Sequence, residues 1–132
     1  MKIKMAFVCN AANLAKDNTV NALGVLSNMV VRGMPAIVSP LTLVIALEGV
    51  VAEWHSNKVD VDFVDPNGVK QLSTISFNFD FVPFNIQKRK DVYHTMCITL
   101  PPLTFVLEGD YEFKVKANKV DIGSLTFPVY RE

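Results

Sequence analysis

NKVDVDFVDPNGVKQLSTISFNFDF, residues 57–81, predicts two long β-strands joined by a tight turn. Apolar side chains stand at every second position of both arms, and an extended chain turns successive side chains to opposite faces. These positions are Val59, Val61, Phe63, Ile75, Phe77, Phe79 and Phe81. Asp65, Pro66 and Gly68 supply the residues that a tight turn requires. Because a lone hairpin is only marginally stable in water, its apolar face predicts a second apolar layer.

The rest of the chain repeats this strand pattern at short spacing. Alternating or continuous apolar segments occupy residues 2–9, 20–31, 41–47, 92–100, 111–116 and 120–129. Residues 10–18 are polar and predict a loop, and the prolines of residues 33–40 predict a connection between sheets. About eight strands without a convincing helix predict one all-β domain over residues 1–132, an antiparallel β-sandwich. A closed or partly open β-barrel is the alternative.

Two glycines interrupt the strand pattern. Gly24 lies inside an apolar segment, which predicts a bulge or a close approach of another segment. The apolar positions change parity between Ile122 and Leu125, which predicts a bulge at Gly123.

Charge and hydropathy exclude several classes of partner. Thirteen basic and thirteen acidic residues give a net charge of zero, so we expect neither nucleic-acid binding nor attraction to an anionic membrane. The apolar start of the chain is too short for a signal peptide, and no apolar run is long enough to span a bilayer. We therefore expect a cytoplasmic protein.

The chain has two cysteines, Cys9 and Cys97, and both lie in apolar segments. Cysteine in such a segment commonly behaves as a small buried hydrophobe. We expect free thiols, with a disulfide as the alternative, because the chain lacks the cysteine density of secreted disulfide-rich domains.

Several segments together resemble a family of bacterial domains of unknown function with an immunoglobulin-like sandwich fold. They are AFVCN (6–10), NALGV (21–25), the Pro40-Leu41 strand start, Glu53-x-His55 leading into VDPNG (64–68), and Gly109-x-Tyr111-x-Phe113-x-Val115. The resemblance covers nearly the whole chain. It implies a fold and no reaction, because one fold serves many functions. The chain departs from antibody domains in lacking their paired cysteines and strand tryptophan.

Three aspartates are the weak candidate for a metal site. Asp60, Asp62 and Asp65 could offer carboxylate oxygens to a calcium ion. The spacing of an EF-hand loop is absent, so a solvated strand face and a turn-capping aspartate explain the three residues better. We expect no metal and no cofactor.

Two histidines are candidates for acid–base or zinc chemistry. His55 or His94, with Glu53 or a cysteine, could form such a site, since imidazole titrates near neutral pH and binds metals. The alternatives are a hydrogen-bonded loop histidine and a histidine on a strand surface. His94 and Cys97 are three residues apart, so a regular strand turns them to opposite faces and excludes a catalytic dyad.

Residues outside the predicted strands are candidates for partner binding. Trp54 and Phe84 are aromatic loop residues, which either form interface hot spots or close the open ends of a sandwich. Lys88 and Arg89 belong to a short basic run that could contact an acidic surface, or simply be solvated.

The absence of phosphate-binding loops, nucleophile elbows and metalloprotease motifs favours a non-enzymatic protein. We expect a binding or assembly module that interacts with a protein partner or with itself through sheet edges or loop ends. One alternative is a small-molecule or enzymatic site around Glu53, Trp54 and His55 at one end of the sandwich. Another is a structural component of a phage or secretion assembly.

Overall fold

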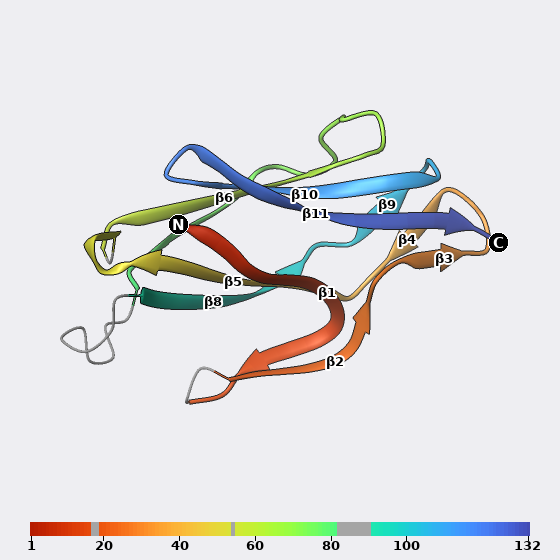
Figure 1. Ribbon diagram of the computed structural model, residues 1–132. Helices are drawn as coiled ribbons and strands as arrows, with labels where there is room; N and C mark the ends of the chain where they lie inside the picture. The colour runs from red at the N-terminus through yellow and green to blue at the C-terminus, as the bar shows by residue number, and fades with distance from the viewer. Residues whose placement is uncertain (17–18, 54, 82–90) are drawn as a thin grey trace.

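Two facing β-sheets make up most of the protein in a computed structural model, which describes residues 1–16, 19–53, 55–81 and 91–132 (Figure 1). The strands are β1 (Lys2–Leu14), β2 (Val20–Leu26), β3 (Met29–Val31), β4 (Ala36–Val38), β5 (Leu41–Val50), β6 (Asn57–Val64), β7 (Ile75–Phe79), β8 (Asp91–Leu100), β9 (Leu103–Phe105), β10 (Gly109–Ala117) and β11 (Val120–Arg131). Sheet A has the order β2-β1-β5-β8, and sheet B has the order β3-β11-β10-β6-β7. Strands β4 and β9 form a separate two-stranded ribbon. The predicted all-β, sandwich-like fold is confirmed.

The hairpin predicted in residues 57–81 is present. Val61 pairs with Ile75, and Asn57 pairs with Phe79. In the turn, the Asp65 carboxylate accepts hydrogen bonds from the backbone N–H groups of Asn67 and Val69, each at 2.9 Å. After the turn, Val64 forms an isolated bridge with Lys70, and β7 then pairs with β6. The second strand begins at Ile75 as predicted but ends at Phe79, two residues before the predicted end at Phe81.

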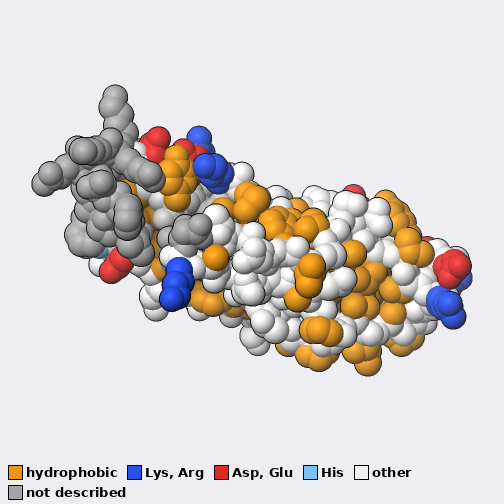
Figure 2. Space-filling model, turned by 90° about the horizontal axis from the view of Figure 1, so that it is seen from below, with side chains coloured by type: hydrophobic (Ala, Val, Ile, Leu, Met, Phe, Trp, Pro, Cys, Tyr) orange, Lys and Arg blue, Asp and Glu red, His pale blue; other side chains and the backbone are white. Residues whose placement is uncertain are grey.

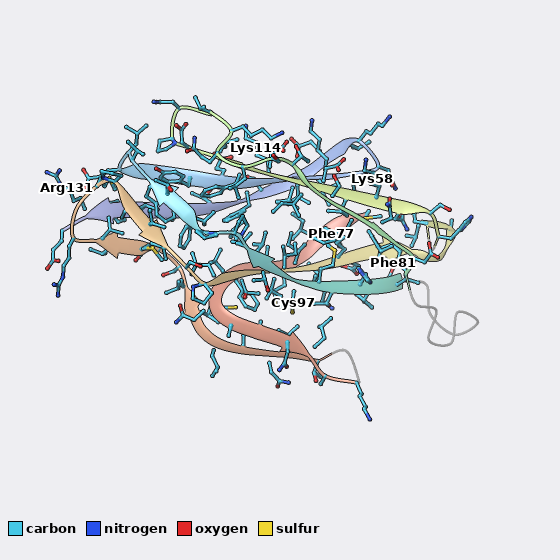
Figure 3. The ribbon with its side chains drawn as sticks, turned by 180° about the vertical axis from the view of Figure 1, so that it is seen from behind. Lys58, Phe77, Phe81, Cys97, Lys114 and Arg131 are labelled. Carbon is cyan, nitrogen blue, oxygen red and sulfur yellow. The ribbon has the colours of Figure 1, made fainter. Side chains whose placement is uncertain are left out.

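Aromatic rings fill the space between the sheets. The ring of Phe63 lies 4.6 Å from Phe113, 5.5 Å from Tyr111 and 6.3 Å from Phe105, measured between centroids. Figure 3 shows the side chains between the layers and, on the outer side of sheet B, those of strands β6 and β10. Burial of these rings removes a large apolar area from water, which is the main force that holds sandwiches together.

Residues 10–14, which belong to the segment predicted to be a loop, are strand. β1 continues through Leu14, and its second half pairs antiparallel with β2 from Val8↔Leu26 to Leu14↔Val20. Its first half pairs with β5, so one strand of 13 residues belongs to two successive ladders and sheet A curls. The prediction failed because asparagine and alanine are poor strand formers in general, whereas here the pairing with β2 decides.

The segment of residues 20–31 is two strands and not one kinked strand. β2 ends at Leu26, where the chain leaves sheet A. β3 then pairs in parallel with β11 of sheet B. The eight predicted strands correspond to the eight longer strands of the described chain. The three strands of three residues each, β3, β4 and β9, were missed because so short a segment has no measurable period.

Both predicted irregularities at glycine are confirmed. Gly24 has φ +65° and faces Asn10 so closely that a Cβ at Gly24 would lie 2.2 Å from the Asn10 Nδ2 atom. The ladder between β10 and β11 shifts register opposite Gly123, where Val115 pairs with Gly123 but Lys116 pairs with Asp121. Elsewhere, the described residues contain one short helix, η1 (Val51–Glu53), and no helix able to cross a membrane.

Candidate functional site

The β1–β2 hairpin, residues 8–26, lies against the outer side of sheet A, away from sheet B (Figure 1). Its presence explains the burial of β5. Leu43, Ile45 and Leu47 face sheet B, while Val44 and Ala46 face outward and are buried as well. A strand covered on both faces reads as a continuous apolar run, which is how residues 43–47 read. That run was the sequence signal for an outer layer, and the alternation-based prediction overlooked it.

β2 is an apolar edge strand of sheet A with exposed side chains. β2 is terminal in the strand order, and no described strand pairs with its outer side. Leu23 is 73% exposed and Val25 is 60% exposed, and residues 19–31 contain no charged side chain. Figure 2 views the molecule from the hairpin side and shows apolar side chains spread over this face, with charged ones mainly toward its ends. Natural edge strands usually carry charges, prolines or bulges that prevent further pairing, and this strand carries no charge and no proline.

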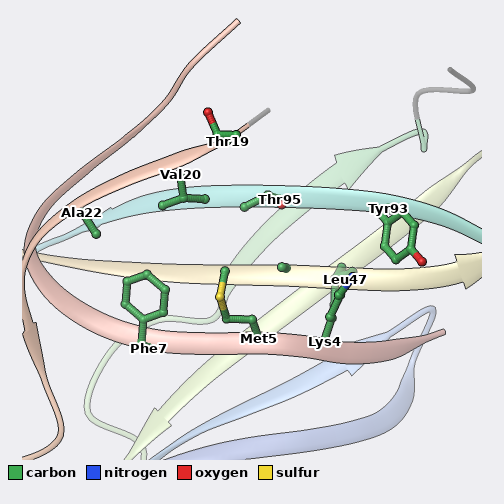
Figure 4. Close-up of a pocket in the computed structure, with 10 residues that line it drawn as sticks. Lys4, Met5, Phe7, Thr19, Val20, Ala22, Leu47, Tyr93 and Thr95 are labelled. Carbon is green, nitrogen blue, oxygen red and sulfur yellow. The ribbon is translucent and has the colours of Figure 1, made fainter. Parts of the chain in front are cut away.

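A cavity of about 680 Å³ lies between the hairpin and the outer face of sheet A (Figure 4). Its walls are mainly apolar and come from four strands: Met5 and Phe7 of β1, Val20 and Ala22 of β2, Ala46 of β5, and the β8 residues beside them. The volume lies within the range of roughly 300–1,000 Å³ that is common for small-molecule sites. We call it the hairpin cavity.

A β-bulge places a cation at the hairpin cavity. Ile3 pairs with Leu47 and Met5 pairs with Ala46, so Lys4 is an extra residue in β1. The extra residue allows Lys4 to share the outer face with Met5, and the Lys4 Nζ atom lies 4.2 Å from the centroid of the Tyr93 ring. The sequence predicted regular alternation in residues 2–9, with residues 3, 5, 7 and 9 on the core face. Instead, Ile3 and Val8 are the ones that pack toward sheet B.

Glu53, a predicted site residue, holds the local backbone together. Its carboxylate accepts hydrogen bonds from the Val50 N–H at 2.9 Å and from the Met1 amino group at 3.1 Å. The Val50 hydrogen bond, followed by the Met1 amino group, holds the pKa of Glu53 below its ordinary value, although partial burial opposes this. The backbone C=O of Glu53 accepts a hydrogen bond from the Asn57 side chain at 2.6 Å. His55 is exposed and lies two residues further along the same connection.

The three aspartates are bonded within the protein. Asp60 accepts a hydrogen bond from Ser76, and Asp62 accepts one from Thr74 and lies 3.3 Å from Lys70 Nζ. The Thr74 hydrogen bond, with a smaller effect of Lys70, lowers the pKa of Asp62. Asp65 caps the turn. Across the described ranges no group of three or more acidic, histidine or cysteine side chains could hold a metal ion.

His94 and Cys97 face opposite sides of β8, as predicted, and His94 is half-buried rather than on an open strand surface. Its ring stacks on Phe79 at 4.3 Å between the sheets, and burial lowers its pKa. Cys97 lies on the outer face of sheet A with Cys9, and both thiols are free. Burial raises the pKa of both, so neither is a ready nucleophile at neutral pH.

The other four predicted partner-binding residues, Trp54, Phe84, Lys88 and Arg89, lie outside the described residues. Of the six predicted partner-binding residues, only Glu53 and His55 are therefore placed, and they lie in the same connection. The hairpin edge and the hairpin cavity were not predicted, because both depend on the pairing of residues 10–14 with β2.

Together, the curled sheet, the facing second sheet and the hairpin on its outer side define an all-β, sandwich-like domain. Within that class, the chain belongs to the family of unknown function DUF6941, which matches residues 4–130. The match includes the whole β1–β2 hairpin and every described residue that lines the hairpin cavity. No curated protein matches the chain.

Proposed function

We propose that this chain is a non-enzymatic assembly module that pairs with a second copy of itself through the free edge of β2. The observation that carries the proposal is the exposure of Leu23 and Val25 on an uncharged edge strand. Backbone N–H and C=O groups on such an edge can extend a sheet with a further strand.

A second copy suits this edge for two reasons. Antiparallel pairing of β2 with β2 of the other copy creates a twofold interface, in which the apolar side chains of one copy meet those of the other. The net charge of zero means that no long-range repulsion separates two copies. Pairing of this kind joins two four-stranded sheets into one and leaves both sandwiches intact.

Two further features support finer parts of this proposal. The Tyr111 hydroxyl donates a hydrogen bond to the Leu107 carbonyl at 2.9 Å, which resembles the tyrosine corner of immunoglobulin-like sandwiches. The free thiols of Cys9 and Cys97 favour a reducing compartment, so we place the module in the cytoplasm.

Sedimentation equilibrium of three proteins tests the proposed pairing. We expect the wild-type chain to form dimers as its concentration rises, and Leu23→Lys to remain monomeric, because a lysine on the edge must lose hydration on pairing. Val120→Lys is the matched control: Val120 is 64% exposed but lies at the start of β11, and its substitution should leave the dimer unchanged. A wild-type chain that stays monomeric up to millimolar concentration would refute the proposal.

A further inference from the structure

The hairpin cavity combines apolar walls with a single cation. None of the described residues that line it is acidic. Phe7 and Ala22 lie toward one end, and Lys4 and Tyr93 lie toward the other (Figure 4). The cavity therefore has the polarity of an amphipathic molecule, apolar along its length and charged at one end.

Lys4 has no carboxylate partner in the described part of the chain, where the four ion pairs involve other groups. The neighbouring Lys2, by contrast, is paired with Glu48 at 3.5 Å. The Tyr93 ring holds the Lys4 ammonium at one face only, and a cation–π contact of this kind leaves the remaining N–H groups free to donate. The charge at the cavity end is thus available to an anion.

The apolar walls of the hairpin cavity and the Lys4 ammonium at one end of it together indicate which class of ligand fits. We propose that the hairpin cavity binds an amphipathic monocarboxylate of the fatty-acid type. The acyl chain lies between β2 and the outer face of sheet A, where it contacts Met5, Phe7 and Val20. The carboxylate lies at the Lys4 ammonium and accepts hydrogen bonds from it. Burial of the chain supplies affinity, and the unpaired ammonium selects a carboxylate over an uncharged head group.

The β-bulge at Lys4 gives this inference its structural basis. Without the bulge, regular alternation from Ile3 would keep Lys4 outward but turn Met5 and Phe7 toward sheet B, so the bulge brings the apolar wall onto the same face as the lysine. Bulges are over-represented next to functional sites, where they redirect a side chain. The bulge therefore creates the combination of a cation and an apolar wall on one face, which regular alternation would not give.

Calorimetric titration with decanoate, kept below its critical micelle concentration, tests the head-group contact. We expect saturable binding to the wild-type chain and about tenfold weaker binding to Lys4→Gln, because a charged hydrogen bond is lost. Lys2→Gln is the matched control and should bind like the wild type, since that lysine already has a partner. Decanol has the same chain without the charge, so it should bind Lys4→Gln and the wild type with equal affinity.

Filling the cavity tests the position of the chain. Ala22→Phe places a ring in the hairpin cavity and should abolish decanoate binding, whereas Leu23→Phe, on the opposite face of β2, should not. If Ala22→Phe fails to fold, the comparison of decanoate with decanol on Lys4→Gln decides alone. Absence of decanoate binding, or equal binding by Lys4→Gln and wild type, would overturn the inference. Leu23→Lys should bind decanoate normally, which separates this inference from the proposed pairing.

Discussion

His94 is half-buried between β8 and β7, edge strands of the two sheets, where its ring stacks on Phe79 at 4.3 Å and meets the edge of Phe81 at 6.5 Å. An imidazolium in this position would lose hydration, and none of the ion pairs found among the described residues involves His94, so burial lowers its pKa. The unfolded chain keeps the ordinary pKa of about 6.5. Protonation therefore favours the unfolded chain over the folded one.

The free energy of unfolding should fall as the pH is lowered from about 6.5 toward the folded pKa of His94, because only the unfolded chain binds the proton in that window. Urea denaturation at several pH values between 7.5 and 5 measures this slope. His94→Phe keeps the ring stack and should flatten the dependence of the unfolding free energy on pH. His55→Phe changes the other histidine of the chain and should leave the slope in place. An unchanged slope in His94→Phe would show that the pH dependence has another source.

The β1–β2 hairpin is the element that gives the molecule its candidate sites, and Gly24 sets its geometry. Gly24 has φ +65°, a conformation that residues with a Cβ rarely adopt, and the Asn10 side chain lies directly over it. The Asn10 amide is the flexible end of a side chain and can move, whereas the backbone conformation cannot change without disturbing the ladder.

Gly24→Ala should therefore destabilise the protein by about 1–2 kcal/mol, the cost of a left-handed conformation for a residue with a Cβ. The double variant Gly24→Ala/Asn10→Ala should recover only the part of the lost stability that comes from contact with the Asn10 side chain. Gly33→Ala is the control, because no atom lies within 4 Å of its Cβ position and its φ is not positive. Equal urea midpoints for Gly24→Ala and Gly33→Ala would contradict this account of the turn in β2.

The extent of the hairpin also separates what the sequence could predict from what it could not. Alternation over residues 57–81 predicted β6, the turn and β7, because local residues determine both the faces and the turn. The strand character of residues 10–14 depends on pairing with β2, and the outward position of Met5 and Phe7 beside Lys4 depends on a one-residue bulge. Neither leaves a periodic signal in the sequence. The candidate sites were missed for that reason, although the apolar run of β5 indicated that both of its faces are covered.

At the scale of the whole molecule, the sandwich and the hairpin differ in how they are held. β5 has a strand on each side and an apolar layer on each face, and six of its first seven residues are hydrophobic side chains that are buried. β2 pairs on one side only and exposes Leu23 and Val25. Amide hydrogen exchange depends on the smallest opening that exposes each N–H group. The β5 amides should thus exchange only on global unfolding, and those of β2 through a local opening of lower free energy.

Phe63→Ala tests this separation, because Phe63 lies on β6 of sheet B and packs against three other rings of the core. Its removal should lower the free energy of global unfolding by about 3–5 kcal/mol. Hydrogen exchange followed by mass spectrometry should then show the same loss of protection in β5 and an unchanged protection in β2. If protection in β2 falls together with that in β5, the hairpin opens only when the sandwich unfolds. In that case β2 would have to pair with a second copy in the conformation it has within the sandwich. A local opening of β2, by contrast, would allow the edge strand to adjust its register to a partner.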